Sequence, residues 1–419
     1  MSHREPNQAA ASSIHTVAEA GAYIASVCFK HGPPERVGIE LEWLLLDPSD
    51  PNRRPDTATL LAALGRHAPH TLDPNSPAAA LPAGGLVTVE PGGQLEISSA
   101  PSASIAALID AMQRDATQLQ VLLESTGFLL SGLAADPHRP PERLLHTPRY
   151  DAMAAAFDAI GPAGRLMMCS TAATQVCVDL GPPEVAEDRW RAAHYLGPVL
   201  LAAFANSPRI CSDLPGPAVS QRMASWWQLD AQRTAPPHSF ELADYIRRAL
   251  DTQVLARRRK RGSWYVRQPM TLRQWLSSDQ PVTTADIDLH LSMIFPPVRP
   301  QGYLELRYLD GQPAGEWIAP LCLIAALFGP GDGVEQVLRC CAEAAARWQQ
   351  ATELGLADPV LRECAGTVLA IAGERLSGLD LPDSLLAQVE RLLQRRLGAG
   401  ISPAMDQLSA SAPNQEVAG

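Results

Sequence analysis

The chain has little positive charge for its length and lacks any long hydrophobic run. Its 419 residues carry 45 Asp and Glu against 34 Lys and Arg, which gives a formal net charge of −11. An acidic surface repels phosphate backbones, so nucleic acid is disfavoured as the main partner. No apolar run approaches the ~20 residues that cross a bilayer, and the first residues, MSHREPNQAAASS, contain no apolar signal core. We therefore expect a cytoplasmic protein with neither a nucleic-acid nor a membrane partner.

Several common functional motifs are also missing. The eight cysteines form no CxxC pair, which favours buried thiols over disulfides or a zinc site. No GxxxxGK[ST] pattern, no GxGxxG before a helix and no GxSxG pattern occurs, so a P-loop, a dinucleotide fold and a serine-nucleophile elbow are disfavoured. The composition that remains, 46% apolar and 19% charged, is typical of a folded globular protein.

The sequence predicts one large domain between two polar ends. Residues 1–14 and 399–419 are rich in small and polar residues and are predicted to be disordered tails, which leaves residues 15–398 as a single domain. The basic run RRRKR at 257–261 is expected to be a solvated helix end or loop. Apolar residues at three- and four-residue spacing predict helices over 103–127, 150–160, 188–206, 239–257, 284–293, 314–329, 334–354 and 381–396.

Four separate stretches alternate aliphatic residues with ionic or amide residues. In VGIELEW (37–43), the apolar side chains point to one face while Glu40 and Glu42 point to the other. The same alternation occurs in VTVEPGGQLEIS (87–98), QVCVDL (175–180) and YLELRY (303–308). A mostly antiparallel sheet with one covered and one open face gives this pattern, whereas buried parallel strands would be continuously apolar. We therefore predict an α+β fold with helices packed on the aliphatic face.

The polar face of this sheet carries carboxylates in place of the usual Thr, Ser, Lys and Gln. If the strands are neighbours, one surface holds Glu40, Glu42, Glu90, Glu96, Asp179 and Glu305. Carboxylates that lie close together repel one another, and Mg²⁺ or Mn²⁺ would relieve the repulsion because both prefer oxygen ligands. The alternative, that these residues only solvate an exposed face, is weakened because Glu is disfavoured in strands.

Arginines can supply positive charge beside this face. Arg307 lies two residues after Glu305, so both side chains share one face of the strand. Arg222 and Arg233 flank a tryptophan pair that begins with Trp226. Metal ions and arginines that face one cleft are what phosphoryl transfer needs, because its catalysis is mainly positioning and charge neutralisation. A structural salt bridge is the alternative for each arginine taken alone.

These motifs resemble the glutamate–cysteine ligases of the plant-like type, and among them the actinobacterial enzymes that start ergothioneine synthesis. GIELE (38–42) is similar to the family's first-strand GxExE, and EPGGQLEISSAP (90–101) is similar to its EPGGQxELSxxP signature, the most specific match. MMCSTAATQVCVD (167–179), FANSP (204–208) and the segment 222–234 also fit, as does HLSMIFPPVRPQGYLELR (290–307). The matches run in order over about residues 35–330.

The resemblance implies a glutamine-synthetase-like fold, in which the concave face of a curved antiparallel sheet holds ATP, Mg²⁺ and L-glutamate and helices pack on the convex face. It also implies the reaction of an ATP-dependent ligase. ATP phosphorylates the side-chain carboxylate of L-glutamate, and the amine of L-cysteine then displaces phosphate to give γ-glutamylcysteine. This would be the first step of ergothioneine biosynthesis, carried out by a monomer or weak homodimer.

The resemblance further assigns roles to residues of this chain. The candidate Mg²⁺ ligands are Glu40, Glu42, Glu90, Glu96 and Glu305. The candidate catalytic residues are Arg307, Glu305 and Arg233, with Arg307 facing the phosphates. The candidate substrate-binding residues are Arg222 for a phosphate or carboxylate, Gln175 and Asp179 for the glutamate end, and Trp226 for the pocket wall.

Three other functions stay open. A ligase that joins glutamate to a different amine would keep the same metal face and differ in its acceptor pocket. A phosphagen-type kinase shares a related sheet, but it should lack the EPGGQLE segment and carry a reactive cysteine. A non-catalytic binding module would show no turnover of Mg²⁺-ATP.

Overall fold

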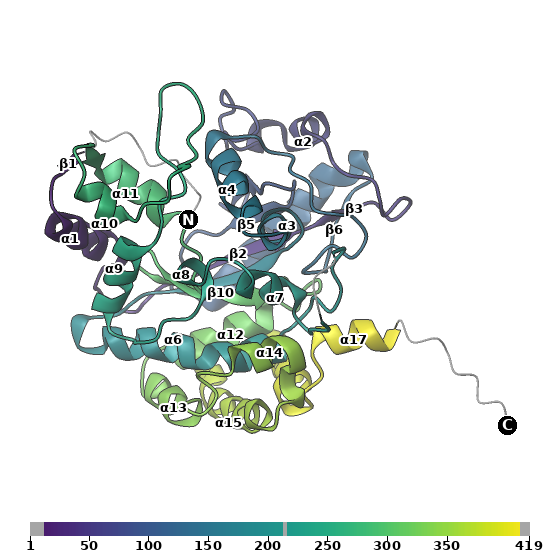
Figure 1. Cartoon of the computed structure of the whole chain (residues 1–419). Helices are drawn as coiled ribbons and strands as arrows, with labels where there is room; N and C mark the ends of the chain where they lie inside the picture. The colour runs from purple at the N-terminus through teal and green to yellow at the C-terminus, as the bar shows by residue number, and fades with distance from the viewer. Residues whose placement is uncertain (1–11, 213–215, 411–419) are drawn as a thin grey trace.

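A six-stranded antiparallel sheet runs through the centre of the molecule (Figure 1). The computed structural model describes residues 12–212 and 216–410. The strand order is β4-β5-β2-β7-β10-β9, and each neighbouring pair is antiparallel. The strands are β2 (Val37–Trp43), β4 (Leu86–Val89), β5 (Leu95–Ser98), β7 (Ala173–Val178), β9 (Val298–Pro300) and β10 (Leu304–Asp310). All the stretches predicted as alternating strands belong to this sheet, so the predicted antiparallel α+β fold is confirmed.

The strand register brings the predicted carboxylates onto one face of the sheet. Glu42 on β2 lies opposite Glu96 on β5, and Glu40 lies opposite Gln175 on β7. Glu305 on β10 lies opposite residue 299 on β9 and residue 177 on β7. Residues directly opposite in an antiparallel pair point to the same side. Carboxylates that are up to 265 residues apart in sequence therefore meet on one surface.

Strand β10 contains a bulge that changes the orientation of its last residues. Its register against β7 shifts by one residue between Leu306 and Leu309. Such an extra residue re-aims the side chains that follow it. With strict alternation, Asp310 would share the aliphatic face with Leu306, but the bulge pairs Asp310 with Ala173 and places it on the carboxylate face.

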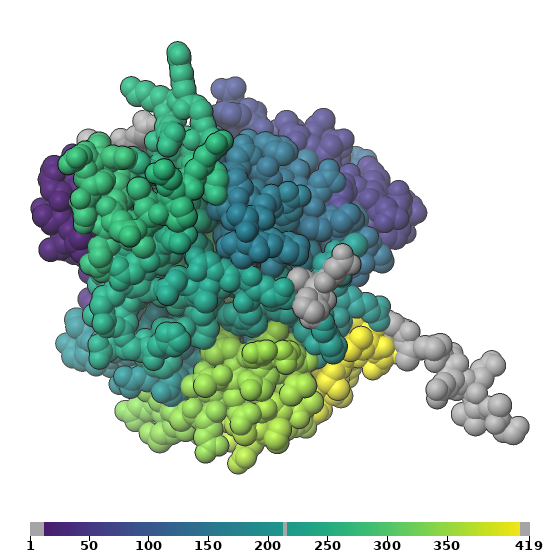
Figure 2. All heavy atoms as spheres, viewed as in Figure 1, coloured from purple at the N-terminus to yellow at the C-terminus, as the bar shows by residue number. Residues whose placement is uncertain are grey.

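Helices cover the aliphatic face, as predicted. Helix α6 (Pro183–Ala203) contacts β10, and α12 (Ile318–Phe328), which is buried along its whole length, contacts β7. Further helices pack beyond these two and form the lower part of Figures 1 and 2. They are α13 (Gly333–Cys340), α14 (Trp348–Leu354), α15 (Pro359–Arg375), α16 (Asp383–Leu393) and α17 (Pro403–Ala410).

The carboxylate face is also covered, and here the prediction of an open face is wrong. Four helices lie on this side of the sheet: α4 (Pro148–Asp158), α5 (Ala163–Cys169), α7 (Gln221–Trp227) and α8 (Ala231–Thr234). Glu40 is only 5% exposed and Glu305 only 1% exposed. The carboxylates therefore face an enclosed site instead of bulk solvent.

The remaining elements surround these layers. The other helices are α1 (Val17–Cys28), α2 (Thr57–Leu64), α3 (Ile105–Leu123), α9 (Leu242–Asp251), α10 (Leu272–Leu276) and α11 (Thr284–Leu291). Two small antiparallel sheets pair β1 (Ser13–Ile14) with β8 (Val282–Thr283) and β3 (Leu45–Leu46) with β6 (Leu129–Leu130). Short turns of 3₁₀ or π helix occur at Gly65–His67, Glu124–Thr126, Gly355–Ala357, Leu376–Leu379 and Gln394–Gly398.

The predicted disordered tails are too long at both ends. β1 pairs with β8, so the chain is already ordered at Ser13–Ile14. α17 is held by hydrogen bonds from the Ala404 amide to the Ala205 carbonyl (2.8 Å) and from the Gln407 side chain to the Asn206 carbonyl (3.0 Å). The rest of both predicted tails, 1–11 and 411–419, lies outside the described residues. Of the predicted helices, 334–354 is divided into α13 and α14, and α15 was not predicted.

The loop between α9 and α10 projects beyond the rest of the face seen in Figure 2. It contains the basic run, of which residues 258–261 are exposed as predicted, while Arg257 stacks on Trp275. Among the described residues, no single helix is long and apolar enough to cross a membrane; only α12 and α13 taken together, bent by 105°, meet that criterion by length and composition.

Candidate active site

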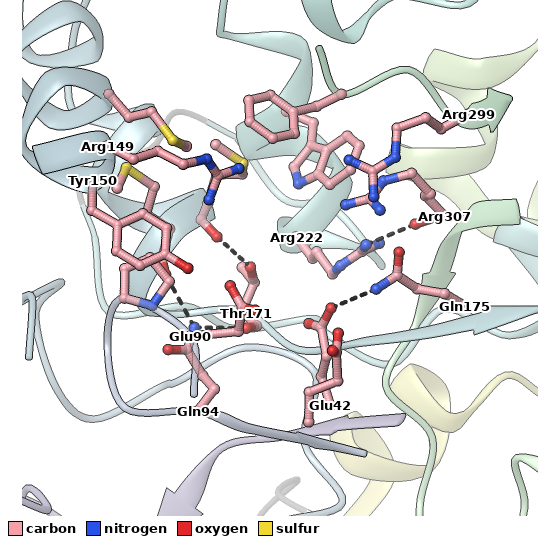
Figure 3. A pocket seen from close by; sticks show the side chains of 17 residues that line it. Glu42, Glu90, Gln94, Arg149, Tyr150, Thr171, Gln175, Arg222, Arg299 and Arg307 are labelled. Carbon is pink, nitrogen blue, oxygen red and sulfur yellow. Dashed lines mark hydrogen bonds between the residues drawn. The ribbon is translucent and has the colours of Figure 1, made fainter. Parts of the chain in front are cut away.

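A cavity that opens to solvent lies between the carboxylate face of the sheet and the helices above it, with about 650 Å³ of empty space including its mouth. Strands β2, β5, β7 and β10 contribute to its floor, and α4, α5 and α7 contribute to its walls. Figure 3 shows Glu42 and Glu90 at the bottom of this cavity, with arginines above them on both sides. Most of the predicted site residues line it: Glu42, Glu90, Glu96, Gln175, Arg222, Trp226 and Arg307.

The turn between β4 and β5 fixes the position of Glu90. The Gly93 amide donates to the Glu90 carbonyl (2.9 Å), and the Glu90 amide donates to the Gln94 carbonyl (2.8 Å). Gly93 has a φ of +91°, which favours glycine. A Cβ on Gly92 would lie 2.6 Å from the Cα of Cys169, so the turn packs directly on the end of α5. The EPGGQLE signature thus forms one wall of the cavity because only glycine allows this close approach.

The carboxylates on the floor are held by neutral donors. The Gln175 side chain donates to Glu42 Oε1 (2.8 Å), and the Ala173 amide donates to Glu42 Oε2 (2.9 Å). The hydroxyls of Thr88 and Ser98 donate to Glu96 Oε1 at 2.6 and 3.2 Å. These bonds orient the carboxylates without neutralising them.

Burial and mutual repulsion disfavour the charged forms of these groups. Burial and the neighbouring Glu42 raise the pKa of Glu90 to about 7. Burial, together with the other three glutamates, raises the pKa of Glu96 well above its ordinary value. Burial also raises the pKa of Glu42, although Arg222 and Arg307 oppose the shift. A cation bound among them would reverse these shifts.

The donor set fits Mg²⁺. Carboxylate oxygens are its preferred protein ligands, and it commonly takes one or two of them beside substrate phosphates and water. Within the described part of the chain, no group of three carboxylates, imidazoles or thiols is arranged to enclose an ion by itself. The cavity therefore offers an open, incomplete set of oxygen ligands, which a polyphosphate could complete.

Glu305 lies beside this carboxylate group in a different electrostatic setting. Its carboxylate accepts from Arg299 Nε at 2.6 Å and Arg299 Nη2 at 3.1 Å, and it lies 3.0 Å from Arg307 Nη1. Burial would raise the pKa of Glu305, but the two arginines outweigh burial and hold that pKa well below its usual range. Both oxygens are already engaged by cations, so the predicted role as a Mg²⁺ ligand is disfavoured. The geometry instead makes Glu305 the anchor of two pocket arginines.

Helix α4 contributes an arginine and a tyrosine that sequence reasoning missed. The Thr147 hydroxyl accepts from the Tyr150 amide (3.3 Å) and Pro148 occupies the first turn, so the helix begins beside the cavity. Arg149 and Tyr150 line the cavity, and Arg149 Nη2 donates to the Ser292 carbonyl (2.9 Å). The available signal was the Thr-Pro helix start, which predicts the helix but does not predict that it faces the carboxylates.

Several polar atoms in the cavity wall have no hydrogen-bond partner among the described residues. They are Arg149 Nε, Gln175 Oε1, Trp226 Nε1 and Arg307 Nε. Buried polar atoms are normally paired, because leaving one unpaired costs about 1–3 kcal/mol. A polar ligand that fills the cavity could satisfy them, which is the strongest sign in the structure itself that this cavity is a binding site.

Besides Glu40 and Glu305, which are buried beside the cavity without lining it, two predicted site residues hold structural positions away from it. Asp179 accepts from the backbone amides of Glu35 and Arg36 at 3.1 and 2.9 Å, so it fixes the loop before β2. Arg233 is fully buried and donates to the carbonyls of Met293 and Gln253. Neither residue lines the cavity. Alternation along a strand and spacing from a tryptophan pair could not distinguish these structural positions from the site.

Of two further predicted residues, Glu40 does not line the cavity and Trp226 does. Glu40 is buried in the sheet next to Gln175, and burial together with Glu305 raises its pKa. Trp226 is in the wall itself, where the guanidinium groups of Arg222 and Arg307 stack at 5.0 and 5.7 Å from its ring centroid. The predicted convergence of distant carboxylates and arginines in one cavity is therefore present in the structure.

An antiparallel sheet with helices on its aliphatic face and a carboxylate- and arginine-lined cavity on the other is the arrangement expected of a glutamine-synthetase-like fold. Comparison with known proteins agrees. The sequence profile of glutamate–cysteine ligase family 2 (GCS2) matches residues 36–416, and the chain belongs to this family. The predicted family and its ligase class are therefore confirmed.

Individual relatives support the same assignment. The chain is 35% identical over 400 residues to the glutamate–cysteine ligase EgtA of Mycobacterium tuberculosis, covering 92% of this chain and 88% of that protein. It is 29% identical over 270 residues to the chloroplastic glutamate–cysteine ligase of Arabidopsis thaliana, covering 61% and 51%. The crystal structure of a glutamate–cysteine ligase from Francisella tularensis in complex with AMP shares the fold, with a TM-score of 0.55 at 14% identity, covering 92% and 86% of the two chains.

Proposed function

We propose that this chain joins the side-chain carboxylate of L-glutamate to the amine of L-cysteine at the expense of ATP, giving γ-glutamylcysteine, ADP and phosphate. The observation that carries the proposal is the division of charge inside one cavity. Its floor presents carboxylates for a metal–polyphosphate complex, and its walls present Arg149, Arg222 and Arg307 toward anionic groups. That division suits a reaction between two anions, and the family is one of glutamate–cysteine ligases.

The chemistry requires activation of the carboxylate. A free carboxylate is a poor acyl donor, because its leaving group would be oxide. Transfer of the terminal phosphoryl group of ATP gives an acyl phosphate, and attack by the amine then releases phosphate. Arginines that face the transferring group stabilise charge that develops during this step. The covered sheet face would keep water away from the acyl phosphate.

Mg²⁺ would be held by one or two carboxylates from the group Glu42, Glu90 and Glu96, together with oxygens of the polyphosphate and water. When bound, it neutralises charge on the polyphosphate. The chain's own residues orient the reactants: Gln175 holds Glu42 in position, and Trp226 supports the planes of Arg222 and Arg307. The unpaired Nε of Arg307 is available to an oxygen of the transferring group or of its acceptor.

One wall of the cavity supports cysteine as the amine acceptor. Met153, Met167, Met168 and Phe295 line it. Thioether and aromatic surfaces are apolar and polarizable, so they suit a small thiol side chain better than a charged one. A ligase that uses a different amine would keep the same metal-binding face. The following experiment distinguishes that alternative from ligation of cysteine.

The test follows ADP release by the purified protein with Mg²⁺-ATP, L-glutamate and a panel of amines, with glutamate or amine omitted as controls. Rapid release that needs both glutamate and cysteine supports the proposal. Release with another amine and none with cysteine would replace the acceptor and keep the ligase class. Hydroxylamine in place of the amine should yield γ-glutamyl hydroxamate, because it traps the acyl phosphate; ADP release without this product would contradict the intermediate.

Cellular context is part of the same proposal. We assign the protein to the cytoplasm, a reducing compartment that suits its eight free thiols. We also assign it to the first step of ergothioneine biosynthesis. We further propose that it is a monomer or a weak homodimer. Deleting the gene in its host and measuring ergothioneine beside other small thiols tests the pathway, since an unchanged ergothioneine level would refute it. Sedimentation over a range of concentrations tests the assembly.

A further inference from the structure

The position of Arg222 in the cavity depends on groups that lie outside the cavity. Its helix, α7, begins at Ser220, whose hydroxyl accepts from the Met223 amide (3.2 Å). The guanidinium group donates from Nη2 to the Arg307 carbonyl (2.7 Å) and stacks on Trp226. Arg222 is only 2% exposed, and burial lowers its pKa. A buried cation of this kind needs a fixed counter-charge to keep its place.

Asp310 is that counter-charge. Its carboxylate is fully buried and lies 3.8 Å from Arg222 Nη1. Asp310 faces Arg222 because the bulge in β10 turns it onto the carboxylate face of the sheet. It does not line the cavity, so it has no access to a substrate in this geometry.

Three neutral donors fix the Asp310 carboxylate. The Asn206 amide and the Ser207 hydroxyl donate to Oδ2 at 2.8 and 2.7 Å, and the Ser220 hydroxyl donates to Oδ1 at 2.9 Å. Ser207 also accepts from the Arg222 backbone amide (3.1 Å). One carboxylate therefore joins the end of β10, the segment after α6 and the first turn of α7, and that turn carries Arg222.

The C-terminal helix supports this network from behind. The Gln407 side chain of α17 donates to the carbonyl oxygen and to the side-chain oxygen of Asn206, at 3.0 and 2.6 Å. The Asn206 side chain in turn donates to the carbonyls of Gly132 and Gly311, and Gly311 directly follows Asp310. Asn206 is thus tied both to the loops beside the end of β10 and to α17.

We propose that Asp310 is a positioning residue for the ligase reaction, which holds the guanidinium group of Arg222 against the cavity wall in the orientation that binds an anionic group of the substrates. The proposal rests on the proposed function of the cavity. Asp310 acts only through Arg222, so its removal matters to catalysis only while Arg222 is present. A purely structural buried aspartate would not show this dependence.

The test is a double-mutant cycle with Arg222→Gln, which removes the cation, Asp310→Asn and the combined variant. Asp358→Asn is the matched control. Asp358 is also a buried aspartate, pairs with Arg347 at 2.7 Å and accepts from two backbone amides at the start of α15, far along the chain from the cavity residues. Each variant is assayed for kcat and KM with glutamate, and its thermal midpoint is measured.

We expect Asp310→Asn to lower kcat/KM for glutamate by about tenfold or more, because the variant leaves the buried Arg222 cation without this counter-charge. We expect the combined variant to stay within about twofold of Arg222→Gln alone. Asp358→Asn should lower the thermal midpoint and leave kcat/KM unchanged. Losses that multiply in the combined variant would overturn the proposal, as would Asp310→Asn kinetics that match those of Asp358→Asn.

Two further measurements keep the proposal testable. If Asp310→Asn does not fold, Ser207→Ala removes one donor to the same carboxylate and should lower kcat/KM in the same direction; unchanged kinetics would count against the proposal. A crystal structure of Asp310→Asn should show the Arg222 guanidinium group moved away from the Arg307 carbonyl, and an unmoved group would overturn it. If the wild type releases no ADP with glutamate and any amine, the proposed function fails, while the crystal structure still decides the role of Asp310.

Discussion

Replacing Glu305 with glutamine tests how the arginine side of the cavity is organised. The wild-type carboxylate lies 2.6 Å from Arg299 Nε and 3.0 Å from Arg307 Nη1, and it is 1% exposed. Glutamine keeps the shape and one acceptor oxygen, but it removes the negative charge. Two buried guanidinium groups would then face each other without their shared counter-ion.

The size of the effect follows from that geometry. Removing one partner of a buried ion pair costs about 3–5 kcal/mol, and the retained acceptor places Glu305→Gln near the lower end. With an unfolding entropy of about 2.1 cal/mol/K per residue, a chain of 419 residues would lose about 3–6 °C of thermal midpoint. Loss of a preorganised electrostatic group typically lowers kcat by about 10²–10³. The variant should therefore fold and be almost inactive.

Glu316→Gln provides the matched control. Glu316 Oε2 also accepts from two nitrogens of one arginine, Arg396, at 3.1 and 2.6 Å, but the pair joins the helices of the aliphatic side. Circular dichroism and thermal melts show whether each variant folds, and ADP release measures activity. Glu316→Gln should lose stability and keep its turnover. If folded Glu305→Gln turned over at the wild-type rate, Glu305 would have no part in arranging the site.

Three other predictions concern the carboxylates, the turn and a residue placed outside the site. Because the raised pKa of Glu90 is about 7, the ligand-free protein should lose stability as pH rises from the ordinary glutamate range through 7. The rise in thermal midpoint caused by Mg²⁺-ADP should accordingly be larger at about pH 8 than at about pH 6. Glu90→Gln should reduce that difference between the two pH values. An unchanged difference in the variant would contradict the titration of Glu90 as a metal ligand. Gly92→Ala should abolish activity, because its Cβ would meet the Cys169 backbone, while Gly161→Ala, whose Cβ meets nothing within 4 Å, should be neutral; an active Gly92→Ala would refute the close approach. Arg233→Lys should lower the thermal midpoint and leave the KM for glutamate within about twofold of the wild-type value. A large rise in KM would show that Arg233 belongs to the substrate site.

The strands and the carboxylate face could be predicted from the sequence because the signal is local. A strand repeats every two residues, so VGIELEW alone fixes that Glu40 and Glu42 share a face. The motif order then indicates that such strands belong to one fold. The structure agrees, since Glu42 lies opposite Glu96 in the sheet. Alternation cannot show how far along a strand the site extends, and Asp179 follows the same pattern while lying outside the cavity.

The cover over the site could not be predicted because it depends on tertiary packing. Nothing in the local sequence of α4 indicates that Arg149 lines the cavity beside Glu90. Helix α17 near the C-terminus was missed for a related reason. Residues 403–410 are weakly patterned, and their helix is held by contacts with the chain near Asn206, about 200 residues earlier. Composition describes the isolated segment, whereas docking decides its structure.

The bulge in β10 shows where local strand alternation stops predicting the site and tertiary structure takes over. Strict alternation from Glu305 predicts that Arg307 shares its face and that Asp310 does not. The extra residue leaves Arg307 where alternation puts it and brings Asp310 to the same face, beside Arg222. One irregular residue thus supplies a buried counter-charge to the arginine side of the cavity. The alternation of the strands predicts the acidic floor, whereas the basic wall depends on a bulge that breaks this alternation.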